Sequence, residues 1–150
     1  MKRQRRKYER PRRPWDKDRI LKEKELIKTF GLRRKREIWS AEALLRKYRR
    51  MARELAAKKN KEKEKVLINK LVKMGLLEKG ADLDDVLSLT VENVLERRLQ
   101  TIIFKKGLTT TPKQARQFIV HGKVILDERK ISYPSYLVVK EEEDKIKVVK

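Results

Sequence analysis

Five basic side chains gather in the middle of the chain, on the face of a predicted helix that lies opposite its apolar residues. They are Arg46, Lys47, Arg49, Arg50 and Arg53. A guanidinium group forms forked hydrogen bonds to phosphate, and an ammonium group acts as a point charge. Few Asp or Glu residues are interleaved with this set, whereas a merely solvated helix face usually carries both signs. The pattern therefore favours a surface that faces phosphate.

A second basic set lies in the N-terminal segment, residues 1–14, which also contains Pro11 and Pro14. This segment has too few apolar side chains to offset the chain entropy lost on folding, so we expect it to be disordered in the free protein. It could be only a solubilising tail, but its strong self-repulsion favours a basic arm that folds onto phosphates. The candidate contacts in the arm are Arg3, Arg5, Arg6, Arg12 and Arg13.

A third set follows a strong helix-start signal. Thr111 is a suitable N-cap, Pro112 suits the first helical position, and Gln114 stands where a capping box requires it. The apolar residues of this predicted helix point to a core. The opposite face then carries Lys113, Arg116 and Gln117.

The sequence offers few residues for disulfides, metal sites or catalysis. The chain has no Cys and one His, which excludes a disulfide framework and a thiolate zinc site and argues against a His-rich metal centre. Asp82, Asp84 and Asp85 fit the N-terminus of a short helix better than a Mg²⁺ site, because no second set of oxygen ligands is nearby. Residues 1–89 hold no nucleophile–base set and no phosphate-cradling glycine loop. We expect no metal, no cofactor and no enzymatic activity.

Charge narrows the choice of partner. The 150 residues carry a net charge of +21, and 43% of them are charged against about 25% in a typical domain. Residues 1–65 hold 27 basic and 10 acidic side chains, or +17, and residues 66–150 hold 16 and 12, or +4. Nucleic acid is the leading partner. No apolar run approaches the ~20 residues of a membrane span, so we expect a soluble, cytosolic protein without a membrane partner.

Helical periodicity predicts the elements of the first half. One helix should carry Trp15 and Phe30 on its apolar face and end at Gly31, and a second should begin at Ser40. Residues 58–65 read as a linker or a frayed helix end. A third helix should follow and stop at Gly75.

The second half predicts a mixed structure. Thr90 should cap one helix that runs to Lys105, and a second should run from Pro112 to Gly122. Residues 124–126, 136–139 and 146–149 should then form a small sheet, with the last two strands joined through residues 141–145.

These motifs resemble a known family. The runs 91–99, 106–107, 112–117, 120–124 and 134–138 resemble the RNA-binding domain of the small-subunit ribosomal protein S-four family. The runs 14–15, 30–32, 35–39 and 44–50 look like the helical domain of its archaeal and eukaryotic form. The resemblance covers residues 14–149. An Asn-Gly turn usual in the family is replaced by Asp127 and Glu128, and the cysteine-bearing zinc knuckle of some members is absent.

The resemblance implies an α+β fold in three parts. Residues 1–14 form a basic disordered arm and residues 15–89 a helical rRNA-binding domain. Residues 90–150 form a small αL-type RNA-binding domain, in which two packed helices near 91–105 and 112–121 precede a short-stranded sheet.

The resemblance also assigns the RNA-binding face of the small domain. Arg97 and Arg98 are adjacent on a predicted helix and cannot point in the same direction, so either of them could instead pair with Glu92 or Glu96. His121 could equally be a capping or core histidine. The implied residues are Arg97, Arg98, Lys113, Gln114, Arg116, Gln117, His121 and Lys123.

The implied function is structural. The chain would bind small-subunit ribosomal RNA, support subunit assembly and help shape the decoding region and the channel by which messenger RNA enters. Its partners would be that RNA, neighbouring small-subunit ribosomal proteins and messenger RNA near the channel, in a cytoplasmic, ribosome-bound location. The alternatives are a free RNA-binding chaperone, an anchor module of an RNA-modifying system, and a DNA-compacting protein.

Overall fold

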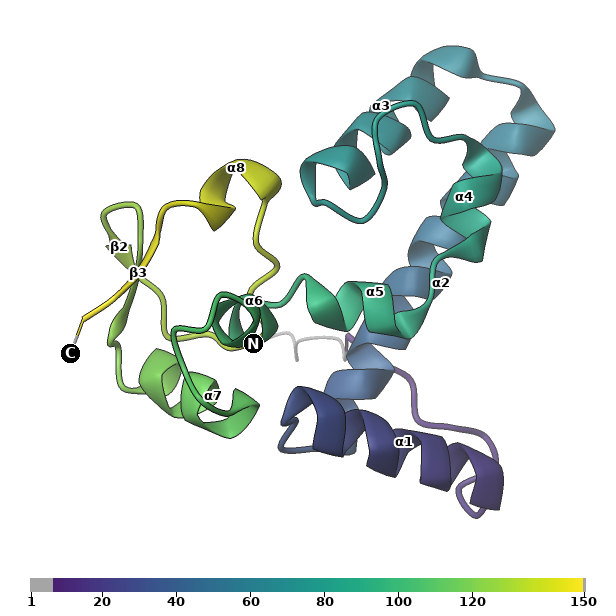
Figure 1. Cartoon of the computed structure of the whole chain (residues 1–150). Coiled ribbons are helices and arrows are strands. Elements are labelled where there is room, and N and C mark those ends of the chain that lie inside the picture. Colours follow the sequence, from purple (N-terminus) through teal and green to yellow (C-terminus); the bar gives the residue numbers. More distant parts are fainter. Residues whose placement is uncertain (1–6, 150) are drawn as a thin grey trace, which may run out of the picture.

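A computed structural model describes residues 7–149 of the chain (Figure 1). Eight helices and three short strands follow one another in this part of the chain. In order, they are α1 (Lys17–Phe30), α2 (Lys35–Lys58), α3 (Lys61–Lys73), α4 (Leu83–Ser88), α5 (Val91–Glu96), α6 (Leu99–Lys105), α7 (Pro112–Val120), β1 (Val124–Leu126), β2 (Arg129–Lys130), α8 (Lys140–Glu143) and β3 (Ile146–Val148).

The first half is built on α2, the longest helix. Figure 1 shows α3, α4 and α5 lying along α2 and α1 crossing its N-terminal end. Leu45, Tyr48 and Ala52 recur at helical spacing on α2 and are buried against these neighbours, as the apolar pattern predicted. The face of α2 opposite this core stripe is therefore left to the basic residues.

The second half packs α6 against α7 and a three-stranded antiparallel sheet of order β2-β1-β3. Ile103, Ile119 and Val124 are fully buried in its core. The turn between β1 and β2 needs one left-handed residue, and Asp127 supplies it with a φ of 59°. The fold is α+β, as expected.

The two halves have separate cores that meet at one short connection. The first core extends to Leu95 and the second begins at Leu99. The change from one core to the other therefore falls between Leu95 and Leu99. Residues 96–98 carry the chain from one core to the other.

The expected single helix over residues 91–105 is wrong, because the chain breaks at this connection. Arg98 has extended backbone, with φ −74° and ψ 142°, and forms an isolated antiparallel bridge with Leu137. The Leu99 amide donates to the Tyr136 carbonyl at 2.8 Å, and the Val138 amide donates to the Arg97 carbonyl at 3.0 Å. The apolar spacing predicted both halves of the helix but carried no signal for this long-range pairing.

The same pairing corrects the predicted sheet. Residues 136–139 form no strand of the sheet and instead pass beside the α5–α6 break. The acidic residues after them form α8 and not a strand connection. Strand β3 pairs with β1, and the sheet also contains β2, for which no strand was predicted.

The predicted start of α2 at Ser40 is also wrong. The helix begins at Lys35, because the Glu37 carboxylate accepts from the amides of Arg33 and Arg34 at 3.1 and 3.3 Å. Ser40 lies inside the helix, and its hydroxyl donates to the Arg36 carbonyl at 2.8 Å. A carboxylate at the third helical position thus does the capping assigned to a serine.

Other local predictions are mixed. Gly31 ends α1 with a φ of 60°, as expected, but Trp15 precedes the helix and is 90% exposed. Residues 58–65 are mostly helical: only Lys59 and Asn60 interrupt α2 and α3. The Asn60 side chain caps α3 by accepting from the Lys63 amide at 3.2 Å.

Candidate nucleic-acid interface

The outer face of α2 carries four of the five cations predicted there, and all four side chains are exposed. Two of them have weak carboxylate partners: Arg46 lies 3.7 Å from Glu9, and Arg50 lies 3.4 Å from Glu54. Exposed pairs of this kind contribute little to stability and exchange readily. We call this set the α2 face; it consists of Arg46, Lys47, Arg50 and Arg53.

The fifth cation, Arg49, does not point outward as predicted. It is half-buried, and its Nη2 donates to the Leu89 carbonyl at 2.6 Å. Arg49 stands four residues after Leu45, a core residue, so helical spacing places it at the edge of the buried stripe. Its guanidinium therefore ties α2 to the end of α4.

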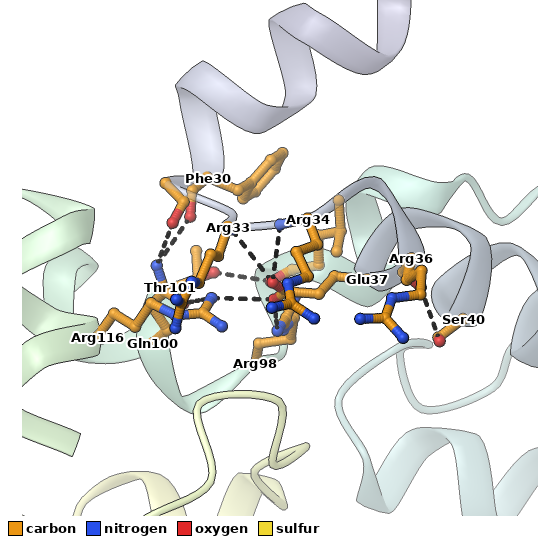
Figure 2. Close-up of polar contacts among 12 residues, drawn as sticks. Phe30, Arg33, Arg34, Arg36, Glu37, Ser40, Arg98, Gln100, Thr101 and Arg116 are labelled. Carbon is orange, nitrogen blue, oxygen red and sulfur yellow. Dashed lines mark hydrogen bonds and ion pairs between the residues drawn. The ribbon is translucent and has the colours of Figure 1, made fainter. Parts of the chain in front are cut away.

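Glu37 joins the two halves of the molecule. Its Oε2 accepts from Arg98 Nη2 at 2.6 Å and from Arg116 Nη1 at 3.0 Å, while its Oε1 accepts the Arg33 and Arg34 amides (Figure 2). The Arg98 side chain is 6% exposed and that of Glu37 is 17% exposed. One carboxylate thus caps α2 and holds two guanidinium groups from the second half.

The electrostatics of this cluster favour the ionised acid. Burial raises the pKa of the Glu37 carboxyl, but hydrogen bonds from Arg116 and Arg98 and the charges of both lower it to about 2, from an ordinary 4.5. The carboxylate is therefore charged at any pH above the acid range, and the two arginines keep their partner.

Gln100 makes a second link beside Glu37. It is fully buried, and its Nε2 lies within 3.1 Å of three carbonyl oxygens, those of Phe30, Gly31 and Pro112. A Cβ at Gly31 would stand 2.7 Å from the Pro112 Cβ. The C-terminus of α1, α6 and the N-terminus of α7 therefore meet in close contact around one amide group.

Arg97 makes its contacts on the other side of the connection formed by residues 96–98. Its Nη1 donates to the Glu143 carboxylate at 2.9 Å, and its Nη2 donates to the Val138 carbonyl at 2.9 Å. A Cβ at Gly75 would lie 2.8 Å from the Arg97 Cζ, so this guanidinium also abuts the turn after α3. We call Glu37, Arg97, Arg98, Gln100 and Arg116 the junction cluster.

The junction cluster changes the expectation for the two adjacent arginines. Arg97 and Arg98 pair with Glu143 and Glu37, and neither uses Glu92 or Glu96. The Arg98 guanidinium bonds across the two halves to Glu37, whereas that of Arg97 bonds within the second half and abuts the turn at Gly75. Neither lies on the exposed face of the small domain. Sequence spacing could not reveal partners 46 and 61 residues away.

The exposed face of α7 keeps most of the residues predicted for it. His121 ends the helix as its C-cap residue, and Lys123 Nζ lies 5.5 Å from the centroid of the Phe118 ring. We call the exposed set the α7 face; it consists of Lys113, Gln117, His121 and Lys123.

Two further predicted residues of this region have structural contacts. Arg116 is half-buried and faces Glu37, so it belongs to the junction. Gln114 Oε1 accepts from the Thr110 amide at 2.9 Å and from its hydroxyl at 2.7 Å, which stabilises the loop before α7. Thr111 caps the helix by accepting from the Gln114 amide at 3.2 Å, as the sequence predicted.

The described part of the arm, residues 7–14, lies against the first half. The Tyr8 ring contacts the Trp39 ring of α2 at a centroid distance of 5.9 Å. Arg12 and Arg13 are exposed. The predicted contacts Arg3, Arg5 and Arg6 lie outside the described residues.

A groove of about 900 Å³ lies between α2 and residues 134–137, which follow β2. We call it the interdomain groove. Its lining includes Lys7 and Tyr8 of the arm, Arg34, Arg36, Leu44 and Lys47 of the α2 region, Val94 of α5, and Pro134, Ser135 and Leu137. A smaller hollow of about 370 Å³ shares Lys7, Tyr8 and Lys47 and continues to Arg46 and Arg50.

Most residues of this groove were not predicted as site residues, and among them are Tyr8, Arg34 and Arg36. Arg34 and Arg36 belong to the basic run 33–36, which precedes the helix start predicted at Ser40. Tyr8 was hidden in a segment that composition described only as a charged arm. The available signal was the run itself, since four cations at a helix N-terminus oppose the helix dipole.

The described part of the chain offers neither a membrane-spanning helix nor a metal-binding cluster. Over residues 7–149, no helix is long and apolar enough to span a membrane. The same residues contain no group of three or more His, Cys, Asp or Glu placed to hold a metal ion.

Two exposed cationic faces on a body joined by buried ion pairs are typical of nucleic-acid-binding proteins. Comparison with known proteins gives the particular kind. Residues 2–96 match the family described as "Ribosomal protein S4/S9 N-terminal domain", and residues 97–144 match the S4 domain. The chain belongs to the ribosomal protein S4 family.

Two relatives cover nearly all of the chain. The protein named "Small ribosomal subunit protein uS4" of Nanoarchaeum equitans is 55% identical over 153 residues, which span 98% of this chain and 84% of the relative. The protein of the same name from Methanothermobacter thermautotrophicus is 48% identical over 145 residues, which span 95% and 85%. Both come from archaea, in agreement with the form that the sequence motifs resembled.

Proposed function

We propose that the chain is a structural constituent of the small ribosomal subunit that binds its ribosomal RNA through the α2 face and the α7 face together. The observation that carries this proposal is the junction cluster, which holds the two faces in one fixed relation. Family membership supports the subunit and the kind of RNA. The role is one of binding and positioning and involves no catalysis.

The mechanism is multivalent clamping. Each exposed cation that neutralises a phosphate releases condensed counterions, so the α2 face supplies affinity that depends on salt and little on sequence. The α7 face adds a second contact at a set position, and the first contact raises the effective concentration of the second. Because A-form major grooves are poorly readable, specificity comes from the shape of the folded RNA.

The arm and the three-part organisation belong to the same proposal. Residues 1–14 would act as a basic arm on neighbouring phosphates, with Arg12 and Arg13 among its contacts. The helical domain and the small domain would each contact a separate RNA helix. In this arrangement the protein clamps the relative orientation of two RNA helices, which is how it would support subunit assembly.

The finer roles are extensions of this proposal. The chain would help shape the decoding region and would lie near the channel by which messenger RNA enters. It would also contact neighbouring small-subunit ribosomal proteins there. Its location would be the cytoplasmic ribosome.

The test is binding to a structured fragment of small-subunit ribosomal RNA across a series of salt concentrations. We expect tight binding, with log K falling linearly against log salt with a slope of several units. Duplex DNA of equal length at the same salt is the control, because its phosphate charge is similar. Tighter binding to the DNA would contradict the proposal and favour a DNA-compacting protein.

A further inference from the structure

The interdomain groove has an apolar floor. Leu44, Pro134 and Leu137 are half-buried, and Val94 is buried beneath them. A volume of about 900 Å³ falls in the upper part of the ~300–1,000 Å³ range of sites that enclose small ligands. The groove is therefore large enough to accept a flat apolar group such as a nucleobase with its ribose.

The rim of the same groove is cationic. Arg34, Arg36 and Lys47 are exposed, and no carboxylate of the described residues lies within 4.0 Å of their charged groups. The one acid in the lining, Glu37, is already engaged by two arginines and two amides (Figure 2). The rim therefore offers charge to an external anion and has no internal partner for it.

The position of Arg34 and Arg36 sharpens this argument. Arg34 is the N-cap residue of α2 and Arg36 lies in its first turn. Cations at a helix N-terminus are unfavourable, because the dipole there is positive. Two positive charges that weaken their own helix, at the mouth of a groove, fit a bound phosphate that both the side chains and the helix would attract.

Tyr8 completes the site at one end. Its ring lines the groove and rests against Trp39, so its orientation is supported by a second aromatic ring. Unpaired RNA bases are commonly read by stacking on aromatic side chains and on arginine planes. The apolar floor, the cationic rim and the aromatic end together match one unstacked nucleotide with its phosphate.

We infer that the interdomain groove binds an unpaired nucleotide of RNA, with the base on the Leu44–Leu137 floor and Tyr8 and the phosphate on Arg34 and Arg36. This inference rests on the proposed function and adds to it a pocket for a single-stranded or bulged residue. An acidic peptide could satisfy the rim, but it would leave the apolar floor and the Tyr8 ring without a matching group.

The experiment uses the full chain and a fluorescent uridine pentamer, with two matched pairs of variants. Arg36→Gln removes a rim charge, and Arg33→Gln removes the same charge from an exposed neighbour outside the groove. Ser135→Leu places bulk in the groove, and Ser132→Leu places the same bulk in the same loop outside it. Arg33→Gln and Ser132→Leu are thus the matched controls for the two groove variants. Circular dichroism checks that all four variants fold.

We expect the groove variants to weaken pentamer binding about tenfold, the value of one stacked base with its phosphate contact, and the control variants to change it less than about twofold. A pentamer that carries 4-thiouridine should cross-link to peptides containing Tyr8 or Leu137. Equal effects within each pair, or cross-links confined to other peptides, would overturn the inference.

Two added measurements separate the possible failures. A decaglutamate competitor that displaces the pentamer at lower concentration than unlabelled oligouridine would overturn the nucleotide assignment in favour of an acidic peptide. Each preparation is also titrated with the structured ribosomal RNA fragment. Failure of the wild-type chain to bind that fragment contradicts the proposed function, whereas normal binding with no groove effect contradicts the groove inference alone.

Discussion

The junction cluster and the α2 face use the same side chain for opposite purposes. In the junction, Arg97 and Arg98 are largely buried, and each is held by a carboxylate within 3 Å. On the α2 face, Arg46 and Arg50 are exposed, and their carboxylate partners lie at 3.4 to 3.7 Å in solvent. Arginine in this protein is thus a buried structural group in one place and an exposed, weakly paired charge in another.

The difference shows how burial decides what an arginine does. Removing one partner of a buried pair leaves a charge without solvation, so the pair is costly to break even if it adds little net stability. An exposed pair costs almost nothing to break, so its arginine is available to an external phosphate. Changes in the junction should therefore alter stability, and changes on the α2 face should alter RNA binding.

The largest expected effect comes from Glu37→Ala. This change strips Arg98 and Arg116 of their shared carboxylate and removes the cap of α2, and we expect a loss of about 3 kcal/mol in the free energy of unfolding. Urea denaturation followed by circular dichroism measures it. The matched control is Glu54→Ala, which removes the exposed partner of Arg50 and should cost less than about 0.5 kcal/mol. Equal losses would remove the distinction between the two regions.

Charge reversal of the α2 face should act on binding alone. With Arg46, Lys47 and Arg50 all changed to Glu, we expect affinity for the structured ribosomal RNA fragment to fall about 100-fold near physiological salt. The slope of log K against log salt should fall by about 2 units, because up to three phosphate contacts are lost. The unfolding free energy should hardly change.

The control for this reversal is the same change at three exposed lysines of α3, Lys61, Lys63 and Lys65. Net charge is altered equally in both variants. A similar loss of affinity in the control would mean that bulk charge, and no particular face, drives binding.

The pH dependence of stability should carry the signature of the junction. The folded pKa of Glu37 is about 2 and its ordinary value is 4.5, so its contribution is fully present above pH 4.5 and is lost as pH falls toward 2. Between pH 7 and pH 2.5, wild type should lose about 2 kcal/mol more than Glu37→Gln. Parallel stability curves for the two proteins would show that the carboxylate charge is not what holds the cluster.

Gly31→Ala tests the packing of the junction apart from its charges. Gly31 and Gly107 both have positive φ, 60° and 69°, so alanine should cost about 1 kcal/mol at either position. Only at Gly31 would the new Cβ meet the Pro112 Cβ, at 2.7 Å, whereas nothing lies within 4 Å at Gly107. We expect Gly31→Ala to cost about 1 kcal/mol more than Gly107→Ala in thermal unfolding. No difference would indicate that α1 and α7 separate easily.

Sequence patterns predicted the parts of this molecule whose causes are local. The helix start at Thr111–Pro112, the stop at Gly31 and the apolar stripe of α2 depend on neighbours within one or two turns. The patterns failed where a distant segment intervenes. The break at Arg98 depends on residues 136–138. The start of α2 was mispredicted for a local reason, because its N-cap residue is Arg34, which is not a typical cap, and the Glu37 side chain bonds the amides of Arg33 and Arg34.

The candidate site divides in the same way. The α2 face and the α7 face follow from helical spacing, and the structure finds most of their residues exposed. Arg49 and Arg116 were grouped with them from helical spacing, and Arg97 and Arg98 from the family resemblance, because neither source can tell a free guanidinium from a bonded one. The interdomain groove could not be predicted from the sequence, because its lining comes from segments that only the fold brings together.

The double use of Glu37 has a consequence for synthesis of the protein. A growing chain that ends at residue 96 already contains α1 to α5, the Arg33 and Arg34 amides that Glu37 accepts, and the buried residues of the first core. Because domains fold in order as they emerge, α2 can be capped before Arg98 and Arg116 have been made. The Glu37 carboxylate is then an acceptor without its arginine partners. The small domain docks onto the folded first half once Arg98 and Arg116 have been synthesised.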